Sequence, residues 1–221
     1  MINFVCLKWG TKYSSEFVNK LLNMLKRHVK QEFKLYCVTE DETNIDKEIE
    51  IIPLETSLGL EKWWNKMVLF SDDFPVKSGM FLDLDMIVQK DISRMYEPTN
   101  LMKFLYTDWI DLKQLKAWTI GDNYKYCDIN SSVLCWDEST RKNHIWKHFI
   151  ENKDKILFMY KGIDNYINNV HKYDVWFPRQ WAYSYWNCNE EYRDEVPIIL
   201  FDYNVEKQDT INEEWVRRLW Q

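Results

Sequence analysis

The N-terminal quarter of the sequence predicts a parallel β-sheet, which limits the possible folds more than any other feature. Residues 2–7, 33–38 and 49–54 are apolar runs of strand length. Between the first two runs, Ser14 or Ser15 precedes apolar residues at helical spacing, namely Phe17, Val18, Leu21, Leu22 and Leu25. A helix that joins neighbouring strands places them in parallel. We therefore expect an α/β fold with a mostly parallel, doubly wound sheet and helices on both faces.

The rest of the chain continues this alternation. Residues 162–169 are polar and rich in turn formers, and we expect a helical segment after them. Thr210 and Glu213 form a capping-box pattern before a short final helix. Further helices are expected over 61–70 and 140–157, and further strands over 80–88, 103–107, 128–136 and 196–201. No repeat or linker interrupts the chain, so we expect a single domain over residues 1–221.

Two carboxylates, Asp83 and Asp85, lie inside the apolar run 80–88. In one continuous strand they would point to the same side, about 6.6 Å apart along the chain. Burying both without partners would cost several kcal/mol or force protonation, and a divalent cation removes that cost. Oxygen ligands suit Mg²⁺ or Mn²⁺. The alternative is a strand that frays at Asp83 and leaves both acids in solvent; we favour the metal site.

Composition narrows the class of protein. The formal charge of −6 and the pI near 5.3 argue against a general nucleic-acid binder, although a local basic groove stays open. Twelve tryptophans exceed what a core of this size normally uses, so some should line a cleft where flat rings stack on sugars or bases. Five widely spread cysteines indicate reduced thiols. The sequence enters a strand at once and has no apolar run of about 20 residues, so we expect a cytoplasmic protein without a membrane span.

The few glycines exclude several familiar phosphate-binding loops. With five glycines, the chain has no Gly-x-Gly-x-x-Gly fingerprint, no Walker A loop and no Gly-x-Ser-x-Gly elbow. A nucleotide diphosphate would therefore have to be held by a metal, which again indicates Asp83 and Asp85.

Four motifs in order resemble the GT-A-fold glycosyltransferases, nearest to the glycogenin and lipopolysaccharide galactosyltransferase type. They are Trp63-Trp64-Asn65-Lys66, Phe81-Leu82-Asp83-Leu84-Asp85, Asn130-Ser131-Ser132-Val133, and a closing strand and helix with Trp215 and Trp220. The resemblance covers nearly the whole chain and includes small marine and phage relatives. It implies a nucleotide-sugar donor, usually UDP-linked, an Mn²⁺ or Mg²⁺ ion on the Asp-x-Asp pair, and transfer with retention to a hydroxyl acceptor. It is also consistent with a bacterial or viral source.

The resemblance also implies roles for individual residues. Asp83 and Asp85 would hold the metal, and Asp83 also the ribose. Asp202 stands where the family has a metal-binding His, and Lys207 where it has a phosphate-binding Lys. The family's Asp-Gln segment is represented by Ile163-Asp164-Asn165, and its His-Gly-x-x-Lys-Pro motif is absent. Lys66, Asp164 and Asn165 would act on the transferred sugar or diphosphate; Thr11 and Tyr13 would meet the nucleotide; Asn130 and Ser131 would face the sugar or acceptor.

Three alternatives to a glycan-modifying transferase stay open. The aromatic region 176–186 would suit a non-catalytic carbohydrate-binding module. Basic residues in the last quarter would suit a transferase that acts on hydroxymethylated DNA bases; these are Lys172, Arg179, Arg193, Lys207, Arg217 and Arg218. A nucleotidyltransferase would need an N-terminal glycine- and arginine-containing loop, which the sequence lacks.

Overall fold

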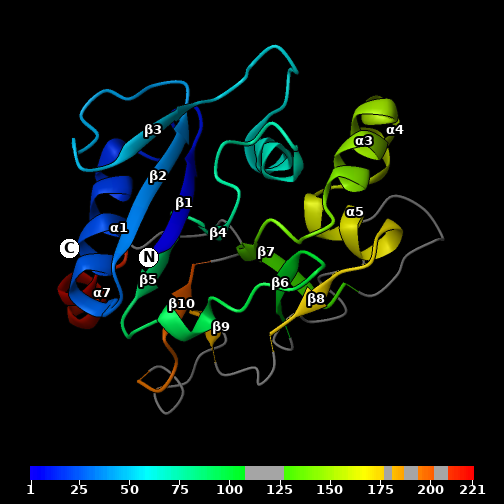
Figure 1. Cartoon of the computed structure of the whole chain (residues 1–221). Helices are drawn as coiled ribbons and strands as arrows, with labels where there is room; N and C mark the ends of the chain where they lie inside the picture. Colours follow the sequence, from blue (N-terminus) through cyan, green and yellow to red (C-terminus); the bar gives the residue numbers. More distant parts are fainter. Residues whose placement is uncertain (108–126, 177–180, 187–193, 202–208) are drawn as a thin grey trace.

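The computed structural model has a seven-stranded sheet at its centre and describes residues 1–107, 127–176, 181–186, 194–201 and 209–221 (Figure 1). The strands are β1 (Ile2–Lys8), β2 (Phe33–Thr39), β3 (Glu50–Pro53), β4 (Gly79–Leu82), β6 (Lys103–Tyr106), β7 (Ile129–Trp136) and β8 (Asp174–Val175), in the order β3-β2-β1-β4-β7-β6-β8. Only β7 runs antiparallel to its neighbours, β4 and β6. The predicted, mostly parallel α/β sheet is confirmed.

A second sheet of three strands was not predicted. It consists of β5 (Met86–Val88), β9 (Ala182–Ser184) and β10 (Ile198–Leu200) in the order β5-β10-β9. The expectation of one continuous strand over 80–88 is therefore wrong. The chain leaves the large sheet after Leu82, bends through Asp83 to Asp85, and enters the small sheet at Met86.

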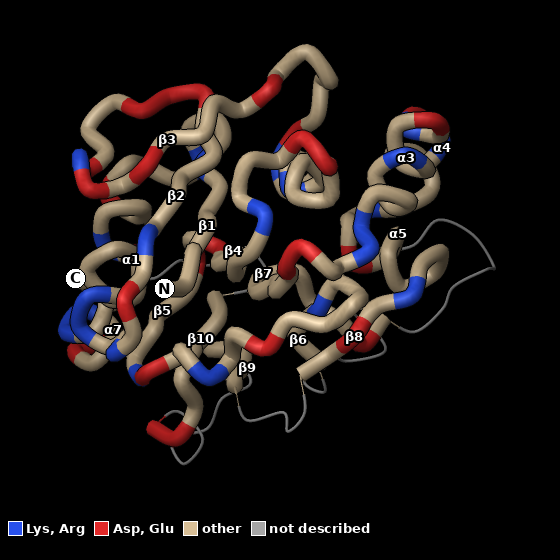
Figure 2. Tube along the Cα trace, viewed as in Figure 1, with Lys and Arg blue, Asp and Glu red and all other residues tan. Residues whose placement is uncertain are grey.

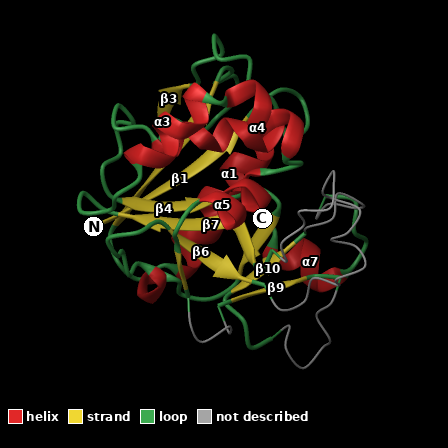
Figure 3. Cartoon of the chain, turned by 90° about the vertical axis from the view of Figure 1, so that its right-hand side faces the viewer, coloured by secondary structure: helices red, strands yellow, loops and turns green. Residues whose placement is uncertain are grey.

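Helices cover both faces of the large sheet, as predicted (Figures 1 and 3). The helices are α1 (Ser15–His28), the 3-10 helix η1 (Lys62–Phe70), α3 (Asn143–Glu151), α4 (Lys153–Met159), α5 (Ile163–Val170) and α7 (Glu214–Leu219). Alternate residues of β1 enter two separate cores: Phe4 and Cys6 pack on the side of α1 and α7, and Val5 on the side of η1 and α3 to α5. This alternation follows from the two-residue period of a strand.

Four expectations about local structure are corrected. The segment 61–70 forms a 3-10 helix, and the helix expected over 140–157 is divided at Asn152. Residues 163–170 are themselves helical, because Ile163, Tyr166 and Ile167 are buried at helical spacing, and the segment after them is extended. The final helix has Glu213 at its N-cap position without a side-chain cap hydrogen bond, and Thr210 lies in a turn before it, so the capping box is not formed.

Two further features are the state of the cysteines and the length of the helices. The described cysteines are buried free thiols, namely Cys6, Cys37, Cys127 and Cys135, and Cys188 lies outside the described residues. Within the described part of the chain, no helix is long and apolar enough to cross a membrane.

A tyrosine hydroxyl joins α3 to the segment that follows α5. The Tyr166 hydroxyl lies 2.8 Å from Nδ1 of His148 and 2.8 Å from Nε2 of His171. Burial lowers the pKa of His171 to about 4, and the nearby imidazoles of His144 and His148 act in the same direction. The folded protein therefore holds His171 in its neutral form.

This burial predicts an acid-sensitive contribution to stability. Unfolded His171 takes up a proton below about pH 6.5, whereas the folded protein protonates it only near pH 4. The free energy of unfolding should therefore fall as pH falls from 6.5 to 4. His171→Gln should remove that part of the slope. Urea unfolding at several pH values checks this, and parallel curves for the two proteins would contradict it.

Candidate active site

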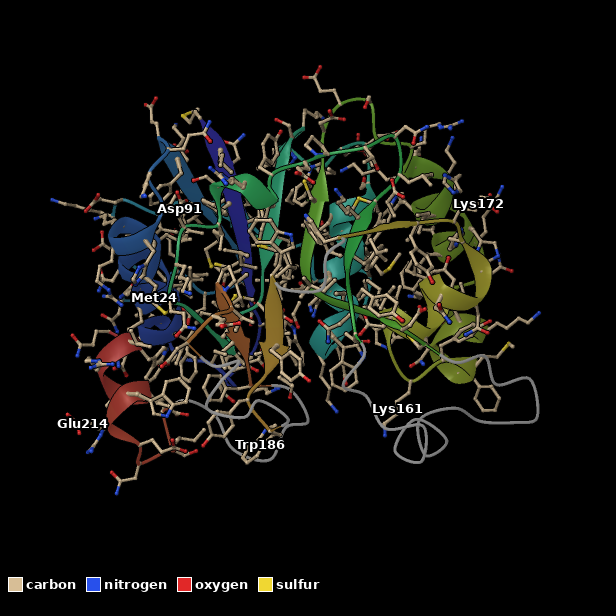
Figure 4. The ribbon with its side chains drawn as sticks, turned by 90° about the horizontal axis from the view of Figure 1, so that it is seen from below. Met24, Asp91, Lys161, Lys172, Trp186 and Glu214 are labelled. Carbon is tan, nitrogen blue, oxygen red and sulfur yellow. The ribbon has the colours of Figure 1, made fainter. Side chains whose placement is uncertain are left out.

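The predicted site residues that the structure describes come from segments that meet at one edge of the large sheet, which we call the carboxyl edge. It contains the carboxyl ends of the parallel strands β1, β2 and β4 and, because β7 is antiparallel to β4, the start of β7. In Figure 4, Lys161, which precedes α5, and Trp186, which follows β9, project from the lower edge of the molecule, while Asp91 lies at the opposite edge. Ligands of open α/β sheets bind at such carboxyl ends.

A buried lysine connects three elements at this edge. The Lys66 ammonium on η1 lies 2.7 Å from Oδ2 of Asp83, and it donates to the carbonyl of Ser131 at 3.3 Å and to its hydroxyl at 3.5 Å. The backbone N–H of Ser131 donates to Oδ1 of Asp164 at 3.0 Å. The Lys66 side chain is 8% exposed and that of Asp83 20%. Charged side chains from η1, α5 and the bend after β4 thus meet around the uncharged polar groups of Ser131 on β7.

The second acid of the pair, Asp85, is held from two directions. Its Oδ2 accepts a hydrogen bond of 2.7 Å from the Tyr13 hydroxyl, which belongs to the loop after β1. Its backbone carbonyl accepts the N–H of Phe201 at 2.8 Å, while the N–H of Asp83 donates to the carbonyl of Ser132 at 2.9 Å. The backbone at Asp83 is therefore fixed by the large sheet and the backbone at Asp85 by the small one, while the Asp85 side chain is held from the loop after β1.

The carboxylates are electrostatically crowded. Burial raises the pKa of Asp83 to about 6, opposed by the positive charge of Lys66 and reinforced by the negative charge of Asp85. Burial also raises the pKa of Asp164, and Lys66 again opposes the shift. The pKa of Tyr13 is raised by burial and by Asp85, so its hydroxyl stays protonated and donates. One lysine does not offset three neighbouring acids, and the cluster favours an added cation.

The donor set is consistent with a hard divalent metal. Asp83 and Asp85 each accept a hydrogen bond at Oδ2, and an ionised carboxylate has about four lone-pair sites, so it can accept several partners at once. Mg²⁺ is commonly bound through one or two carboxylates together with substrate phosphates. Among the described residues no group of three His, Cys, Asp or Glu is arranged to hold an ion alone. The residues therefore fit a metal that arrives with, and is shared by, a phosphate-containing ligand.

The remaining predicted residues are placed as follows. Asn130 is next to the cluster, and its Oδ1 accepts the N–H of Ser132 at 2.7 Å. Asn165 follows Asp164 on α5 and is buried, with its carbonyl accepting the Asn169 side chain at 2.7 Å. Thr11 is exposed in the loop after β1, and the contacts described for the cluster do not include it. Asp202 and Lys207 lie outside the described residues.

The fold has clear counterparts among solved structures. The galactosyltransferase LgtC, in complex with donor and acceptor sugar analogs, superposes with a TM-score of 0.67 at 12% identity, over 99% of this chain and 94% of that chain. The glycosyltransferase GlyE of Streptococcus pneumoniae gives 0.67 at 13% identity, over all of this chain and 60% of that one. The bifunctional glycosyltransferase WbbM gives 0.62 at 10% identity, over 99% of this chain and 51% of that one. The chain has the GT-A-like fold of these glycosyltransferases. No protein-family model and no curated protein matches the sequence.

Sequence reasoning missed a second polar group on this glycosyltransferase fold. Lys8, at the end of β1, is buried, and its ammonium lies 3.3 Å from Oδ2 of Asp41 after β2. Glu40 accepts the N–H of Gly10 at 2.5 Å. Both acids belong to the segment 39–44, whose composition indicates only a turn. The sequence feature that could have indicated this group is Lys8, a cation at the end of an otherwise apolar strand.

An open pocket elsewhere does not contribute to this site. Its volume is about 530 Å³, and its lining includes Asn3, Tyr36, Pro53 and Ser78. Asn3 is near the start of β1 and Ser78 precedes β4, so the pocket lies toward the amino ends of these strands. None of the predicted site residues lines it.

The Lys66–Asp83 pair predicts a stability effect that depends on pH. Lys66→Met leaves a mostly buried carboxylate without its cation and should lower the free energy of unfolding by about 3 kcal/mol at pH 8. The loss should shrink toward pH 5, because Asp83, whose pKa is already about 6 beside Lys66, then becomes protonated. Chemical unfolding with chelator and without nucleotide measures both values.

A double variant provides the control for this prediction. Asp83→Asn removes the charge that Lys66→Met leaves unpaired, so the two changes together should destabilise less than the sum of the single changes. Additive losses would show that the ion pair does not couple the two residues.

Proposed function

We propose that the chain is a metal-dependent glycosyltransferase that moves a sugar from a nucleotide-sugar donor, UDP-linked in the family it resembles, to a hydroxyl acceptor. The observation that carries the proposal is the partly buried Asp83–Asp85 pair beside the buried Lys66 at the carboxyl edge. A fold shared with glycosyltransferases supports the same activity. The absence of a glycine-rich phosphate loop from the sequence makes metal-assisted binding of the diphosphate the consistent choice.

Asp83 and Asp85 would hold Mn²⁺ or Mg²⁺, and Asp202 is proposed as a further oxygen ligand. The ion would neutralise charge that develops on the departing diphosphate. Lys66 adds a fixed ammonium at the same place, since its side chain is already held by Asp83 and Ser131. Lys207 is proposed to contact the phosphates. Thr11 and Tyr13 are proposed to contact the nucleotide, and Tyr13 also positions Asp85 through its hydroxyl.

The proposed transfer step does not need a strong base from the protein. The bond between the sugar C1 and the diphosphate oxygen breaks as the acceptor hydroxyl oxygen bonds to C1. The hydroxyl proton passes to the departing diphosphate, which is consistent with retention. Asp164 is held by the N–H of Ser131 and would stabilise positive charge on the sugar ring or accept its hydroxyls. Asn165, Asn130 and Ser131 are proposed to shape the sugar pocket around it.

A single charge-removing substitution tests the metal assignment. Asp85→Asn should reduce transfer or donor hydrolysis with Mn²⁺ by about 10²–10³-fold, because it removes a transition-state charge partner. Asp73→Asn makes the same chemical change at an exposed acid before β4 and should leave the rate unchanged. Assaying a panel of nucleotide sugars with the wild-type protein and with each variant identifies the donor. Undiminished turnover in Asp85→Asn would disprove the assignment.

Thermal stability provides a separate test that needs no acceptor. UDP and Mn²⁺ together should raise the melting temperature, because a ligand that binds only the folded state stabilises it. Either component alone should have little effect, and Asp85→Asn should lose the joint effect. Glycan binding that ignores both chelator and nucleotide would instead favour a non-catalytic carbohydrate-binding module.

A further inference from the structure

An aromatic cluster lies at the end of the small sheet where Phe201 pairs with Asp85. Tyr185 follows β9, and its ring stacks on Phe201 with centroids 4.9 Å apart and planes 23° apart. Trp186 contacts Tyr185 edge to face at 4.8 Å, and Trp215 lies 6.0 Å from the same ring. Phe201 is fully buried, whereas Trp186 is 38% exposed and projects from the carboxyl edge (Figure 4).

A carboxylate lies within this cluster. Oε1 of Glu213 accepts the Tyr185 hydroxyl, and Oε2 accepts the indole N–H of Trp215. Glu213 thus holds two rings at defined positions while each of its oxygens keeps further acceptor capacity. We call Tyr185, Trp186, Glu213 and Trp215 the aromatic platform. Apolar ring faces beside a hydrogen-bond acceptor match a sugar, whose C–H face is apolar and whose rim carries hydroxyls.

Strand pairing fixes the distance from the platform to the proposed metal site. The N–H of Phe201 donates to the carbonyl of Asp85, and the N–H of Tyr185 donates to the carbonyl of Leu200, both at 2.8 Å. The small sheet has the order β5-β10-β9, so Asp85 and Tyr185 are two strand spacings apart, which is about 10 Å. A chain of one or two sugar residues spans this gap.

From these contacts we propose that the platform binds the acceptor, and that the acceptor is a neutral glycan stacked on Trp186. The inference rests on the proposed function and adds the acceptor class to it. A nucleic-acid acceptor fits less well, because its phosphates would meet Glu213 and the neighbouring Glu214. The described basic residues of the last quarter do not form one patch. Arg217 and Arg218 end α7, whose tube is partly blue in Figure 2, while Lys172 lies on the opposite side of the molecule from Glu214 of α7 (Figure 4).

The first experiment locates binding directly. Protein labelled with 5-fluorotryptophan, with the Trp186 signal assigned from Trp186→Phe, is titrated with lactose, maltose, cellobiose and mannobiose in the presence of UDP and Mn²⁺. The same titration uses single-stranded DNA that contains hydroxymethylcytosine, at low salt. A shift of the Trp186 signal by at least one sugar supports the proposal. A shift by none of the sugars, or by DNA alone, overturns it.

The second experiment measures the consequence for transfer to the sugar that shifts the signal. Trp186→Ala should raise the KM for that acceptor about tenfold, as expected for loss of one ring contact, with little change in kcat. Donor hydrolysis in the absence of acceptor should stay at the wild-type rate. Phe158→Ala, which removes an aromatic ring that is 73% exposed on α4, is the matched control and should change nothing. An unchanged acceptor KM in Trp186→Ala would overturn the proposal.

The two proposals fail in different ways. If the proposed function is wrong, donor hydrolysis and joint stabilisation by UDP and Mn²⁺ are both absent in the wild-type protein. If only the platform is wrong, both are present and the Trp186 variants behave as wild type toward the acceptor.

Discussion

The candidate site depends on the ion pair between Lys66 and Asp83. Asp83 directly follows the buried strand β4, and without a cation its ionised form would be strongly disfavoured there. Lys66 compensates part of that cost and in doing so fixes η1 to the start of β7 through Ser131, whose N–H positions Asp164. A single ammonium thus arranges side chains from four segments. Because it only partly offsets the neighbouring acids, the same arrangement retains an attraction for a divalent cation.

The bend between Asp83 and Asp85 is where the two sheets separate. A continuous strand would have carried both acids along one surface of the large sheet. Instead, the Asp83 N–H donates to the carbonyl of Ser132 on the large sheet. The Asp85 carbonyl accepts the N–H of Phe201, which follows β10 of the small sheet. The two acids proposed to bind the metal are therefore fixed by backbone hydrogen bonds on both sides. Such support from regular elements makes the geometry of a site less dependent on loops.

The apolar periodicity of the sequence predicted six of the seven strands of the large sheet, because each strand is defined by residues that are neighbours in sequence; the two-residue strand β8 was not predicted. The resemblance to glycosyltransferases, rather than the periodicity, implied that Lys66, Asp83, Asp85 and Asp164 share one site. The structure brings Lys66, Asp83 and Asp164 into one cluster, with Asp85 in the same bend. The small sheet was missed, since the pairing of Met86 with Leu200 joins segments more than a hundred residues apart. Helix α5 was missed for another reason: its many Asn residues concealed the spacing of Ile163, Tyr166 and Ile167, which was already present in the sequence.

The separation into two sheets also has a consequence for how donor and acceptor would be combined. The large sheet and the helices on it present Ser131 on β7, Lys66 on η1 and Asp164 on α5, which face the donor in the proposed function, whereas the aromatic platform lies beside the small sheet. Asp85 belongs to both, because its side chain accepts the Tyr13 hydroxyl from the loop after β1 and its carbonyl pairs with β10 beside the platform. In the proposed arrangement, a change in acceptor would therefore involve Tyr185 or Trp186 after β9, or Glu213 before α7, while Asp83 and Asp85 could stay as they are. In such an arrangement the two substrates are recognised by separate sheets and meet only at the bend that carries Asp85.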